Sequence, residues 1–524
     1  MLHRTQHIPR FLVTAEQMQQ IEGRVFAAGM PVSALMEKVS GLIARQISEH
    51  YPVSQAARVG VLVGPGHNGG DALVVARELH SQGYQVQICQ PLDKAKQLTA
   101  DQARYAQHLG IPFVPSVAEW RDRDLIIDGL FGFGLERPIE GKLASLVKQI
   151  NRLACPVYSI DLPSGIHTDS GQVMGIAIRA ERTGCLGLWK RAFVQAPALA
   201  YLGQPELIDF GLPLADIRAV LGETPTVQRL TDEVAIAQLP LPRSATAHKY
   251  KVGHLLLIAG SRQYAGAALL SAKGAVASGV GMLTLAIPET IRLALLPSLP
   301  GALLLGCPET EAGAIANLPE DLSKYDAIAL GPGLTTAVPT LLKSVLAADC
   351  PLLLDADGLN LLAQQDPVAT LQQRTAPTVL TPHPGEFKRL FPAIKGDPGE
   401  QAQRAAEASQ AIVVLKGAKT AIACPTSQRL WVNPESTPAL ARGGSGDVLT
   451  GLLGGLLAQK MLDSKPDSDS SDVISAATAA ALAAVWWQAQ AGRYASDRNS
   501  ELGVSPDRLF QALDPFLGSI LASC

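Results

Sequence analysis

Residues 58–79 read RVGVLVGPGHNGGDALVVAREL and place three features in succession. A short run rich in valine comes first, a glycine-rich turn follows, and the segment ends in a helical pattern rich in Ala, Val and Leu. A strand followed by a turn and a helix is the unit from which parallel sheets covered by helices are built. The stretch therefore predicts an α/β fold.

The same alternation of apolar runs and helical patterns recurs along both halves of the chain. Besides 58–63, strands are expected at 84–89, 124–128, 156–161 and around 181–187, and then at 254–260, 282–288, 326–331, 351–356, 377–381, 411–417 and 429–433. Each half therefore predicts its own parallel sheet with helices on both faces, that is, a three-layer α/β sandwich.

The length of the chain supports two domains. With 524 residues, 47% of them hydrophobic and 17% charged, the chain exceeds what one core usually organises and has the composition of packed domains. The segment 211–234 loses the strand–helix alternation and carries several Gly and Pro residues. It predicts an N-terminal domain of residues 1–224 and a C-terminal domain of residues 225–524.

The net charge and the cysteine content limit the binding partners and the cellular compartment that we expect for the protein. The net charge of −3 offers none of the positive excess that nucleic-acid binding needs. The seven cysteines include no C-x-x-C pair, and the first residues lack the apolar segment of a secretion signal. The most apolar stretches, from 449 and from 474, are shorter than a bilayer span. We therefore expect a cytoplasmic protein that binds neither nucleic acid nor membrane.

The glycine-rich turn of the first half follows the pattern G-x-G-x-x-G between a strand and a helix, which by itself indicates dinucleotide binding. Asp71 argues against this interpretation, because a pyrophosphate at the helix N-terminus would meet its carboxylate. A simple helix cap formed by Asp71 is an equally good explanation of this loop taken alone.

Polar residues also follow the third and fourth strands of the first half. Asp128 ends one strand, Asp161 ends the next, and Ser164 comes shortly afterwards. Because ligands of an open α/β sheet lie beyond the carboxyl ends of its strands, we expect these side chains and Asn68 to converge on one crevice. Each residue alone is more often a turn former, but together they indicate a site. Oxygen ligands of this kind suit a hard cation rather than zinc.

The segments GPGHNGGDA (64–72), DGLFGFG (128–134) and DLPSG (161–165) resemble the epimerase domain of NAD(P)H-hydrate repair enzymes. The resemblance implies a Rossmann-like three-layer sandwich, a potassium ion held by Asn68, Asp128 and Ser164, and Asp161 as the catalytic acid or base. The hydrated cofactor is expected to contact His67, Asn68, Gly69, Gly70, Asp71, Gly132, Phe133, Gly134, Leu135, Glu136, Arg137, Pro138 and Asp161. His67 and Ala72 depart from the family pattern, which has Asn and Gly there.

A second glycine-rich segment, GGSGD at 443–447, precedes a helical pattern in the second half. Its glycines would present backbone N–H groups at a helix N-terminus, which is a ready anion site. Asp447 follows at once and would place a carboxylate beside the anion, the arrangement that phosphoryl transfer to a hydroxyl requires. The alternative is a glycine-rich N-terminus that only packs closely on a neighbouring element.

Two further loops follow strands of the second half. Lys416, Lys419 and Thr420 could reach nucleotide phosphates, although two loop lysines taken alone are more often simply solvated. The pattern around them is not a P-loop, so a P-loop ATPase is disfavoured. In TPHPGEF (381–387), His383 lies between two prolines that restrict its backbone, which favours a binding role.

Several separated motifs of the second half resemble the NAD(P)H-hydrate dehydratase domain: HKYKVGHLLLIAGS (248–261), GPGL (331–334), DADGLN (355–360), TPHPGEF, LKGAKT (415–420) and GGSGDVLTG (443–451). The resemblance implies a ribokinase-like three-layer sandwich in which Asp447 is the catalytic base. The hydrate is expected near Ala265, Gly333, His383 and Asp447, and ADP near Lys416, Gly417, Ala418, Lys419, Thr420 and Gly446. The run 435–442 departs from the family pattern.

Together the two resemblances imply a bifunctional metabolite repair enzyme that acts on NADH or NADPH hydrated across the C5–C6 bond of the nicotinamide ring. The first domain would interconvert the R and S forms. The second would dehydrate the S form with ADP and Mg²⁺, giving AMP and phosphate, and the family implies a homo-oligomer. Two other classes stay open: a vitamin or sugar kinase that shares the GGSGD segment, and a first half that is only a binding or scaffold module.

Overall fold

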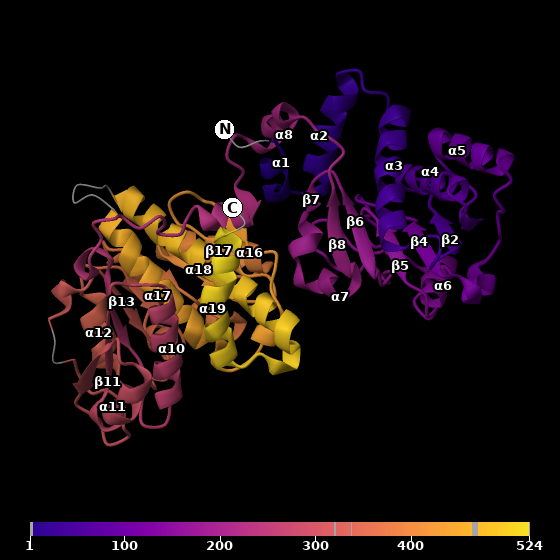
Figure 1. Ribbon diagram of the computed structural model, residues 1–524. Coiled ribbons are helices and arrows are strands. Elements are labelled where there is room, and N and C mark those ends of the chain that lie inside the picture. Colours follow the sequence, from indigo (N-terminus) through magenta and orange to yellow (C-terminus); the bar gives the residue numbers. More distant parts are fainter. Residues whose placement is uncertain (1–3, 319–320, 337, 464–469, 523–524) are drawn as a thin grey trace. The chain divides into compact units, whose positions relative to one another are not determined.

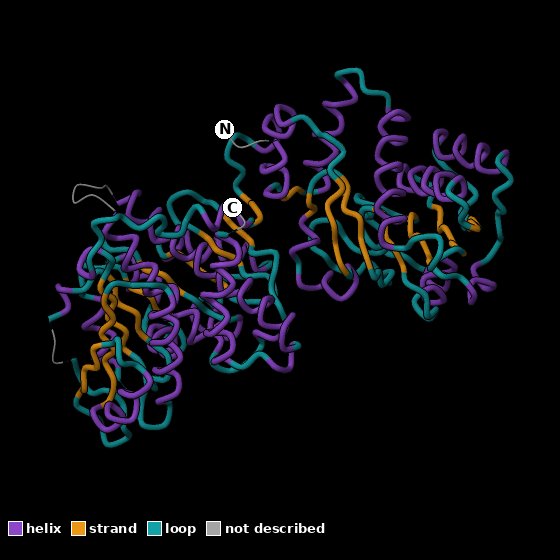
Figure 2. The backbone as a smooth tube through the Cα atoms, in the orientation of Figure 1, coloured by secondary structure: helices purple, strands orange, loops and turns teal. Residues whose placement is uncertain are grey.

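The computed structural model describes residues 4–318, 321–336, 338–463 and 470–522. The chain divides into two compact units, Met1–Pro225 and Thr226–Cys524, and the division follows Pro225 rather than residue 224. Each unit holds its own mainly parallel sheet with helices packed against it (Figures 1 and 2). The predicted class, two α/β domains with parallel sheets, is confirmed.

The N-terminal unit is built on a six-stranded parallel sheet in the order β3-β2-β4-β5-β6-β8. Its strands are β2 (Arg58–Val63), β3 (Gln85–Cys89), β4 (Leu125–Gly129), β5 (Val157–Ile160), β6 (Arg182–Leu186) and β8 (Gln204–Ile208). Chain order reverses at β2, whose Leu62 pairs with Cys89 on one side and Asp128 on the other. A ligand crevice is therefore expected beyond the carboxyl ends of β2 and β4.

Helices cover both faces of this sheet. They are α1 (Arg4–His7), α2 (Ala15–Ala27), α3 (Val32–His50), α4 (His67–Ser81), α5 (Gln97–His108), α6 (Gly141–Ile150), α7 (Leu199–Leu202) and α8 (Leu214–Leu221). Alternate residues of β2 separate the two layers, because Val61 packs in the cluster that contains α3 and α4, whereas Leu62 packs with Val147 and Ile150 of α6. A short parallel pair, β1 (Leu12–Val13) with β7 (Trp189–Lys190), ties the segment before α2 to the segment after β6.

The turn between β2 and α4 needs glycine because the backbone is pressed against its neighbours. A Cβ on Gly64 would lie 1.7 Å from the carbonyl oxygen of Leu130, and a Cβ on Gly69 would lie 2.0 Å from that of Gly64. A Cβ on Gly129 would likewise meet the carbonyl oxygen of Asn68 at 3.2 Å. The start of α4 is thus held against the end of β4.

Helix α4 begins at His67, with Gly66 at the capping position. Asp71 therefore lies in the second turn of the helix. The alternative in which Asp71 only caps the helix is wrong, because the four preceding residues are already helical.

The C-terminal unit holds a ten-stranded sheet in the order β12-β11-β10-β13-β14-β15-β16-β17-β18-β9. Its strands are β9 (Val227–Arg229), β10 (His254–Ile258), β11 (Met282–Pro288), β12 (Leu303–Cys307), β13 (Ala327–Leu330), β14 (Leu352–Leu354), β15 (Thr378–Leu380), β16 (Ile412–Leu415), β17 (Ala421–Ala423) and β18 (Leu430–Val432). Pairing is parallel except that β17 runs antiparallel to β16 and β18. The loops after β13, β14, β15 and β16 therefore emerge at one edge.

The helices of this unit form the outer two layers. They are α9 (Asp232–Ile236), α10 (Ala265–Ala277), α11 (Glu289–Leu295), α12 (Pro339–Leu346), α13 (Asp357–Leu362), α14 (Pro367–Gln372), α15 (Pro384–Leu390), α16 (Pro398–Ser409), α17 (Ser445–Asp463), α18 (Ser470–Asn499) and α19 (Pro506–Leu521). Helices α10, α17, α18 and α19 share one apolar cluster with Leu255 and Leu257 of β10. Helix α16 packs against β16 and β17 outside that cluster.

Three glycines, which we call the glycine seam, let α10 and α17 approach backbone to backbone. A Cβ on Gly274 would lie 2.3 Å from the carbonyl oxygen of Val448, and one on Gly451 would lie 1.7 Å from that of Ser271. A Cβ on Gly455 would lie 2.0 Å from the hydroxyl oxygen of Ser278. Since these contacts advance along both helices together, α10 and α17 run in the same direction and begin at the same edge of the domain.

Replacing Gly451 by Ala should destabilise the C-terminal domain. A methyl group 1.7 Å from a backbone oxygen cannot be relieved by side-chain rotation, so the two helices must separate. Over-packing of this kind typically costs about 1–3 kcal/mol. Thermal unfolding measures the effect, with Gly518→Ala on α19 as the control because its Cβ would meet nothing within 4 Å. An unchanged midpoint for Gly451→Ala would contradict this packing.

All the strands expected from apolar runs are present, but several short ones were missed. The missed strands are β1, β7, β8, β9, β12 and β17. β9 and β12 lie at the two edges of the C-terminal sheet, and β9 falls within the segment interpreted as the domain boundary. In the described parts of the chain, no helix has the length and apolar character needed to cross a bilayer.

Candidate active sites

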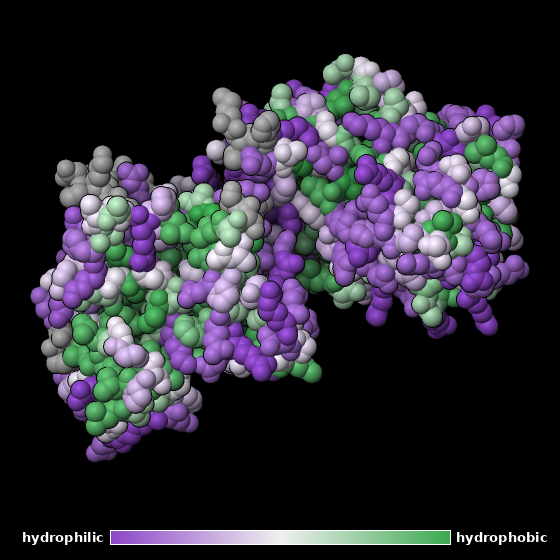
Figure 3. Space-filling view, viewed as in Figure 1, coloured by the Kyte–Doolittle hydropathy of each residue, from purple (hydrophilic) through white to green (hydrophobic). Residues whose placement is uncertain are grey.

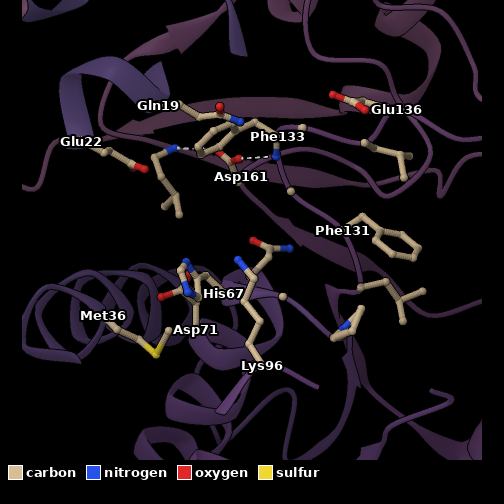
Figure 4. A pocket seen from close by; sticks show the side chains of 18 of the residues that line it. Gln19, Glu22, Met36, His67, Asp71, Lys96, Phe131, Phe133, Glu136 and Asp161 are labelled. Atoms are coloured by element: carbon tan, nitrogen blue, oxygen red, sulfur yellow. Dashed lines mark hydrogen bonds between the residues drawn. The ribbon is translucent and has the colours of Figure 1, made fainter. Parts of the chain in front are cut away.

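A cavity of about 940 Å³ lies beyond the carboxyl ends of β2, β4 and β5 in the N-terminal unit (Figure 4). The following residues expected to contact the hydrate line it: His67, Asn68, Asp71, Gly132, Phe133, Gly134, Leu135, Glu136, Arg137, Pro138 and Asp161. Gly69 and Gly70 do not line the cavity, because they are buried against Gly64 and Met36. The start of α4 and the loop after β4 thus form facing walls.

Asp161 is held in place from several directions. It has a φ of 69°, in the left-handed region that Asp adopts more readily than most residues. Its Oδ2 accepts a hydrogen bond from the Phe133 amide at 2.9 Å, and its Oδ1 accepts one from Lys190 Nζ at 2.5 Å. Burial, the largest single effect, lowers the pKa of Lys190, but Asp161, Cys185 and Glu22 together exceed it, so the pKa of Lys190 is raised. The two side chains therefore form a buried ion pair next to the cavity.

Sequence analysis did not identify Lys190. It lies in a two-residue strand outside every recognised motif, and its side chain is completely buried. A lysine in such a strand gives no signal of its own, because only the fold brings it to Asp161.

Asp128 lies fully buried beside this cavity wall. It accepts hydrogen bonds from Ser164 Oγ at 2.6 Å, from the Ser164 amide at 2.8 Å and from Ser159 Oγ at 2.9 Å. Ser164 Oγ also lies 3.2 Å from the carbonyl oxygen of Phe131. Burial raises the pKa of Asp128, and the hydrogen bonds from Ser164 oppose that rise.

These groups fit a hard monovalent cation. Carboxylate, hydroxyl and carbonyl oxygens of Asp128, Ser164 and Phe131 gather in one place. The Asn68 side chain, expected to be the remaining ligand, has a buried Nδ2 without a hydrogen-bond partner among the described residues. It reaches the same wall, since a Cβ on Gly132 would lie 3.1 Å from both Asn68 Oδ1 and Asp161 Oδ2.

Two further carboxyl groups face the cavity. Asp71 accepts a hydrogen bond from Ser40 Oγ at 3.2 Å, and burial raises its pKa well above the usual value. Glu22, on α2, points into the cavity from the side of Asp161 (Figure 4). Burial raises the pKa of Glu22 to about 7, Asp161 adds to the rise, and Lys190 opposes it. Glu22 precedes all the motifs and was not identified from the sequence.

In the C-terminal unit, Asp447 lies in the first turn of α17, directly after the glycine-rich segment. A Cβ on Gly446 would lie only 3.6 Å from Lys416 Nζ, so the helix start passes close to the end of β16. Burial raises the pKa of Asp447 to about 6, Asp355 adds to the rise, and Lys416 opposes it. A partly buried carboxyl group with such a pKa suits a general base near neutral pH.

Asp355, which follows β14, connects the elements of this site. Its Oδ1 accepts hydrogen bonds from Lys416 Nζ at 2.7 Å and Thr381 Oγ1 at 2.9 Å. Its Oδ2 accepts one from Thr450 Oγ1 at 2.6 Å, one turn beyond Asp447 on α17. Asp355 is 2% exposed. The DADGLN motif was recognised, but no role was assigned to this aspartate, because the hydrogen bonds that define it join residues far apart in sequence.

His383 caps α15 rather than projecting freely. Its Nδ1 accepts hydrogen bonds from the Gly385 amide at 2.9 Å and the Glu386 amide at 3.4 Å, and its ring remains 51% exposed. The Glu386 carboxylate accepts from the His383 amide at 2.8 Å. Burial raises the pKa of Glu386, and Lys416 opposes that rise. The ring is therefore fixed at the start of α15 next to Glu386.

The remaining expected contacts lie on two sides of this site. Gly333 adjoins the start of α10, since a Cβ there would lie 3.0 Å from Ala267 Cβ, and this places it near Ala265. Lys419, in the loop before β17, donates to the carbonyl oxygen of Pro434. Burial lowers the pKa of Lys419 to about 8, and nearby Arg229 and Arg493 lower it further. Gly417, Ala418 and Thr420 belong to the same loop.

Comparison with known proteins agrees with the division of the chain into two domains. The family model of NAD(P)H-hydrate dehydratase matches residues 255–515, and that of the YjeF-related protein N-terminus matches residues 32–192. A bifunctional NAD(P)H-hydrate repair enzyme of Synechocystis is 55% identical over 97% of this chain and 94% of its own. The corresponding enzyme of Thermosynechococcus vestitus is 50% identical over 98% of both chains.

Among solved structures, the ADP/ATP-dependent NAD(P)H-hydrate dehydratase of Bacillus subtilis, co-crystallised with ATP and Mg²⁺, is 35% identical. The alignment covers 56% of this chain and 98% of that one, with a TM-score of 0.46.

The two α/β units, each with carboxylates gathered at the strand ends, define a two-domain enzyme. The sequence identity of 50–55% to relatives that match over nearly their whole length specifies the enzyme family. The chain belongs to the family of bifunctional NAD(P)H-hydrate repair enzymes, with an N-terminal epimerase domain and a C-terminal dehydratase domain.

Proposed function

We propose that the N-terminal domain interconverts the R and S forms of hydrated NADH and NADPH. The C-terminal domain then dehydrates the S form at the expense of ADP, giving AMP and phosphate. The observation that carries the second activity is the partly buried Asp447 beside the glycine-rich start of α17 and Lys416. An enzyme active site is itself chiral, so the dehydratase is expected to accept only one C6 epimer. The fused epimerase converts the other epimer into that form.

In the dehydratase reaction, Asp447 takes the proton of the 6-hydroxyl group while the hydroxyl oxygen attacks the terminal phosphorus of ADP. The bond from that phosphorus to the bridging oxygen breaks and AMP leaves. The ring nitrogen then expels phosphate from C6, and loss of a C5 proton restores the dihydropyridine. The amides of residues 443–446 and the Lys416 charge stabilise the anionic phosphoryl group.

The hydrate contacts Ala265, Gly333 and His383 in this proposal. ADP contacts Lys416, Gly417, Ala418, Lys419, Thr420 and Gly446. Mg²⁺ offsets phosphate charge when the nucleotide is bound. Since Mg²⁺ is usually bound through substrate phosphates and retained waters, we assign it chiefly to the nucleotide.

In the epimerase domain, Asp161 is the proposed acid or base, and its hydrogen bond from Lys190 fixes the position of its carboxyl group. Asn68, Asp128 and Ser164 hold K⁺, which supplies a fixed positive charge near the substrate's polar groups. The hydrate lies along the cavity walls formed by His67, Asn68, Asp71 and residues 132–138. Either route to the other epimer, ring opening or water loss, needs a positioned proton donor and acceptor at C6 and its hydroxyl group.

Both activities are tested together by supplying a mixture of R and S hydrates with ADP and following the absorbance of the reduced nicotinamide. Recovery of the whole mixture requires epimerase and dehydratase in one chain. Recovery of only the S fraction contradicts the epimerase assignment, and no recovery contradicts the dehydratase assignment. Appearance of a stable phosphorylated product would identify a kinase instead.

Asp355→Asn should change the pH dependence of dehydration as well as its rate. The loss of its negative charge removes one cause of the raised pKa of Asp447, so the acidic limb of kcat/KM should move to lower pH. The variant also weakens the hydrogen bonds through which the Asp355 carboxylate joins Lys416 to Thr450 of α17. Thr381→Val, which removes a single hydrogen bond to Asp355, is the control and should leave the limb in place. An unmoved limb in Asp355→Asn would contradict the proposed electrostatic coupling.

Two broader features remain proposals. The six described cysteines are all free thiols, which supports a reducing, cytoplasmic location. We also propose self-association of the chain. Figure 3 shows apolar surface in the area of α11, where Leu293 is 71% exposed and Leu303 of the edge strand β12 is 56% exposed. Exposed apolar side chains next to a sheet edge favour pairing with another chain.

A further inference from the structure

The epimerase cavity contains more ionisable groups than one acid or base requires. Asp161 and Lys190 form the buried ion pair, and Asp71 and Glu22 are two additional carboxyl groups at the cavity wall. The hydrogen bonds differ in an informative way: Asp71 is bonded to Ser40 of α3, whereas none of the described residues is recorded as a hydrogen-bond donor to Glu22. Glu22 is therefore the carboxyl group left available to a ligand.

The position of Glu22 depends on the fold and not on any motif. It lies on α2, which follows the short strand β1, and β1 pairs with β7, the strand that contains Lys190. The same pairing thus brings both Glu22 and Lys190 to the end of β5, where Asp161 lies. The matched N-terminal family region begins at residue 32, so Glu22 lies outside it.

We propose that Glu22 is the proton donor that works together with Asp161 in epimerisation, with Asp161 as the proton acceptor. This inference rests on the epimerase function proposed above. In the water-loss route, Glu22 gives its proton to the 6-hydroxyl group, the C6–O bond breaks, and the ring nitrogen supplies the electron pair that forms the iminium ion. Because both carboxyl groups enter the cavity from the same side, the planar iminium ring turns about its bond to the ribose, and water adds to the other face of C6. Asp161 takes the proton of this water, after which solvent exchange returns a proton to Glu22 and removes one from Asp161.

The electrostatic surroundings support this division of roles. Asp161 accepts hydrogen bonds from a buried lysine and a backbone amide. Glu22 faces Asp161, which follows β5, as well as Asp71 of α4 and Lys190 of β7. Burial and the nearby Asp161 raise the pKa of Glu22 to about 7, which leaves it about half protonated at neutral pH and increasingly protonated below it. A carboxyl group with a raised pKa, next to a second carboxyl group held by a lysine, is suited to act as the acid of an acid–base pair.

The pH dependence follows from the sign of that shift. Glu22 must be protonated to donate, so epimerisation should fall as pH rises through about 7. Glu22→Gln should lower the rate of R–S interconversion by about 100-fold or more and abolish this alkaline limb. Glu16→Gln is the matched control, because Glu16 is an exposed carboxylate on the same helix that only bonds to Gln20. It should keep both the rate and the limb.

The measurement is R–S interconversion by the full-length protein, followed by separation of the two epimers, across pH. Dehydration of pure S hydrate by the same preparation shows that the chain is folded and active. A normal rate and an unchanged alkaline limb in Glu22→Gln would overturn the proposal. A wild-type rate that does not fall above pH about 7 would overturn it too, without relying on any variant. Absence of interconversion in the wild-type protein would instead contradict the epimerase function itself.

Discussion

Replacing Asp447 by Asn is expected to lower the rate of S-hydrate dehydration by at least about 100-fold. The change keeps the shape of the side chain and removes only its ability to accept the hydroxyl proton. Since the pKa of Asp447 is about 6, the unaltered enzyme should lose dehydratase activity as pH falls below this value and the carboxylate becomes protonated. Initial rates of nicotinamide absorbance recovery with pure S hydrate and ADP, measured across pH, check both statements.

The other domain of the same chain supplies the control. R–S interconversion should be unaffected by Asp447→Asn, because the residues that line the epimerase cavity belong to the N-terminal unit. Near-normal dehydration by the variant would remove Asp447 from the mechanism. The glycine-rich segment would then be only a close-packed helix start.

Asp161→Asn is expected to have a comparably large effect on the epimerase, with R–S interconversion reduced by about 100-fold or more. Asn adopts left-handed backbone conformations readily, so the φ of 69° should be retained. The substitution removes the proton acceptor and the partner of Lys190 together. Dehydration of pure S hydrate should continue, because Asp447 and its neighbours are untouched.

A complication of this variant is the buried lysine that it leaves unpaired. Breaking a buried ion pair by removing one partner typically costs about 3–5 kcal/mol, so the N-terminal domain could be weakened. The double variant Asp161→Asn with Lys190→Met removes both charges and should restore stability while interconversion stays low. If interconversion returns in the double variant, Asp161 is a structural counter-ion to Lys190 and not the acid or base.

The sequence predicted a site correctly where a single short segment contains the strand end or loop, the turn and the helix start that form it. The glycine-rich turn at 64–71 and the segment at 443–447 combine a strand or loop, a turn and a helix start, so they identify both domains and the position of Asp447. The expectation that Asn68, Asp128, Asp161 and Ser164 converge depended only on the rule that parallel strands end at one edge. The structure places Asn68 and Asp161 at the cavity wall, and Asp128 and Ser164 are buried together and do not line it.

Long-range contacts could not be read in this way. Lys190 and Glu22 reach Asp161 because a two-residue strand pair joins segments about 180 residues apart, and so short a pair has no periodic pattern to detect. Asp355 acquires its role from three hydrogen bonds to Thr381, Lys416 and Thr450. Such partners are defined by tertiary packing, which the sequence of any one of these segments does not contain.

The glycine seam between α10 and α17 has a consequence for how much the dehydratase site must reorganise when it binds. Both helices begin at the site, one at Ala265 and the other at Ser445, and their contact is largely between backbones that have no rotamers to freeze. The conformational entropy of these helix starts is therefore lost during folding rather than during binding. Nucleotide and hydrate meet a preorganised surface, so more of their interaction energy is left to stabilise the transition state.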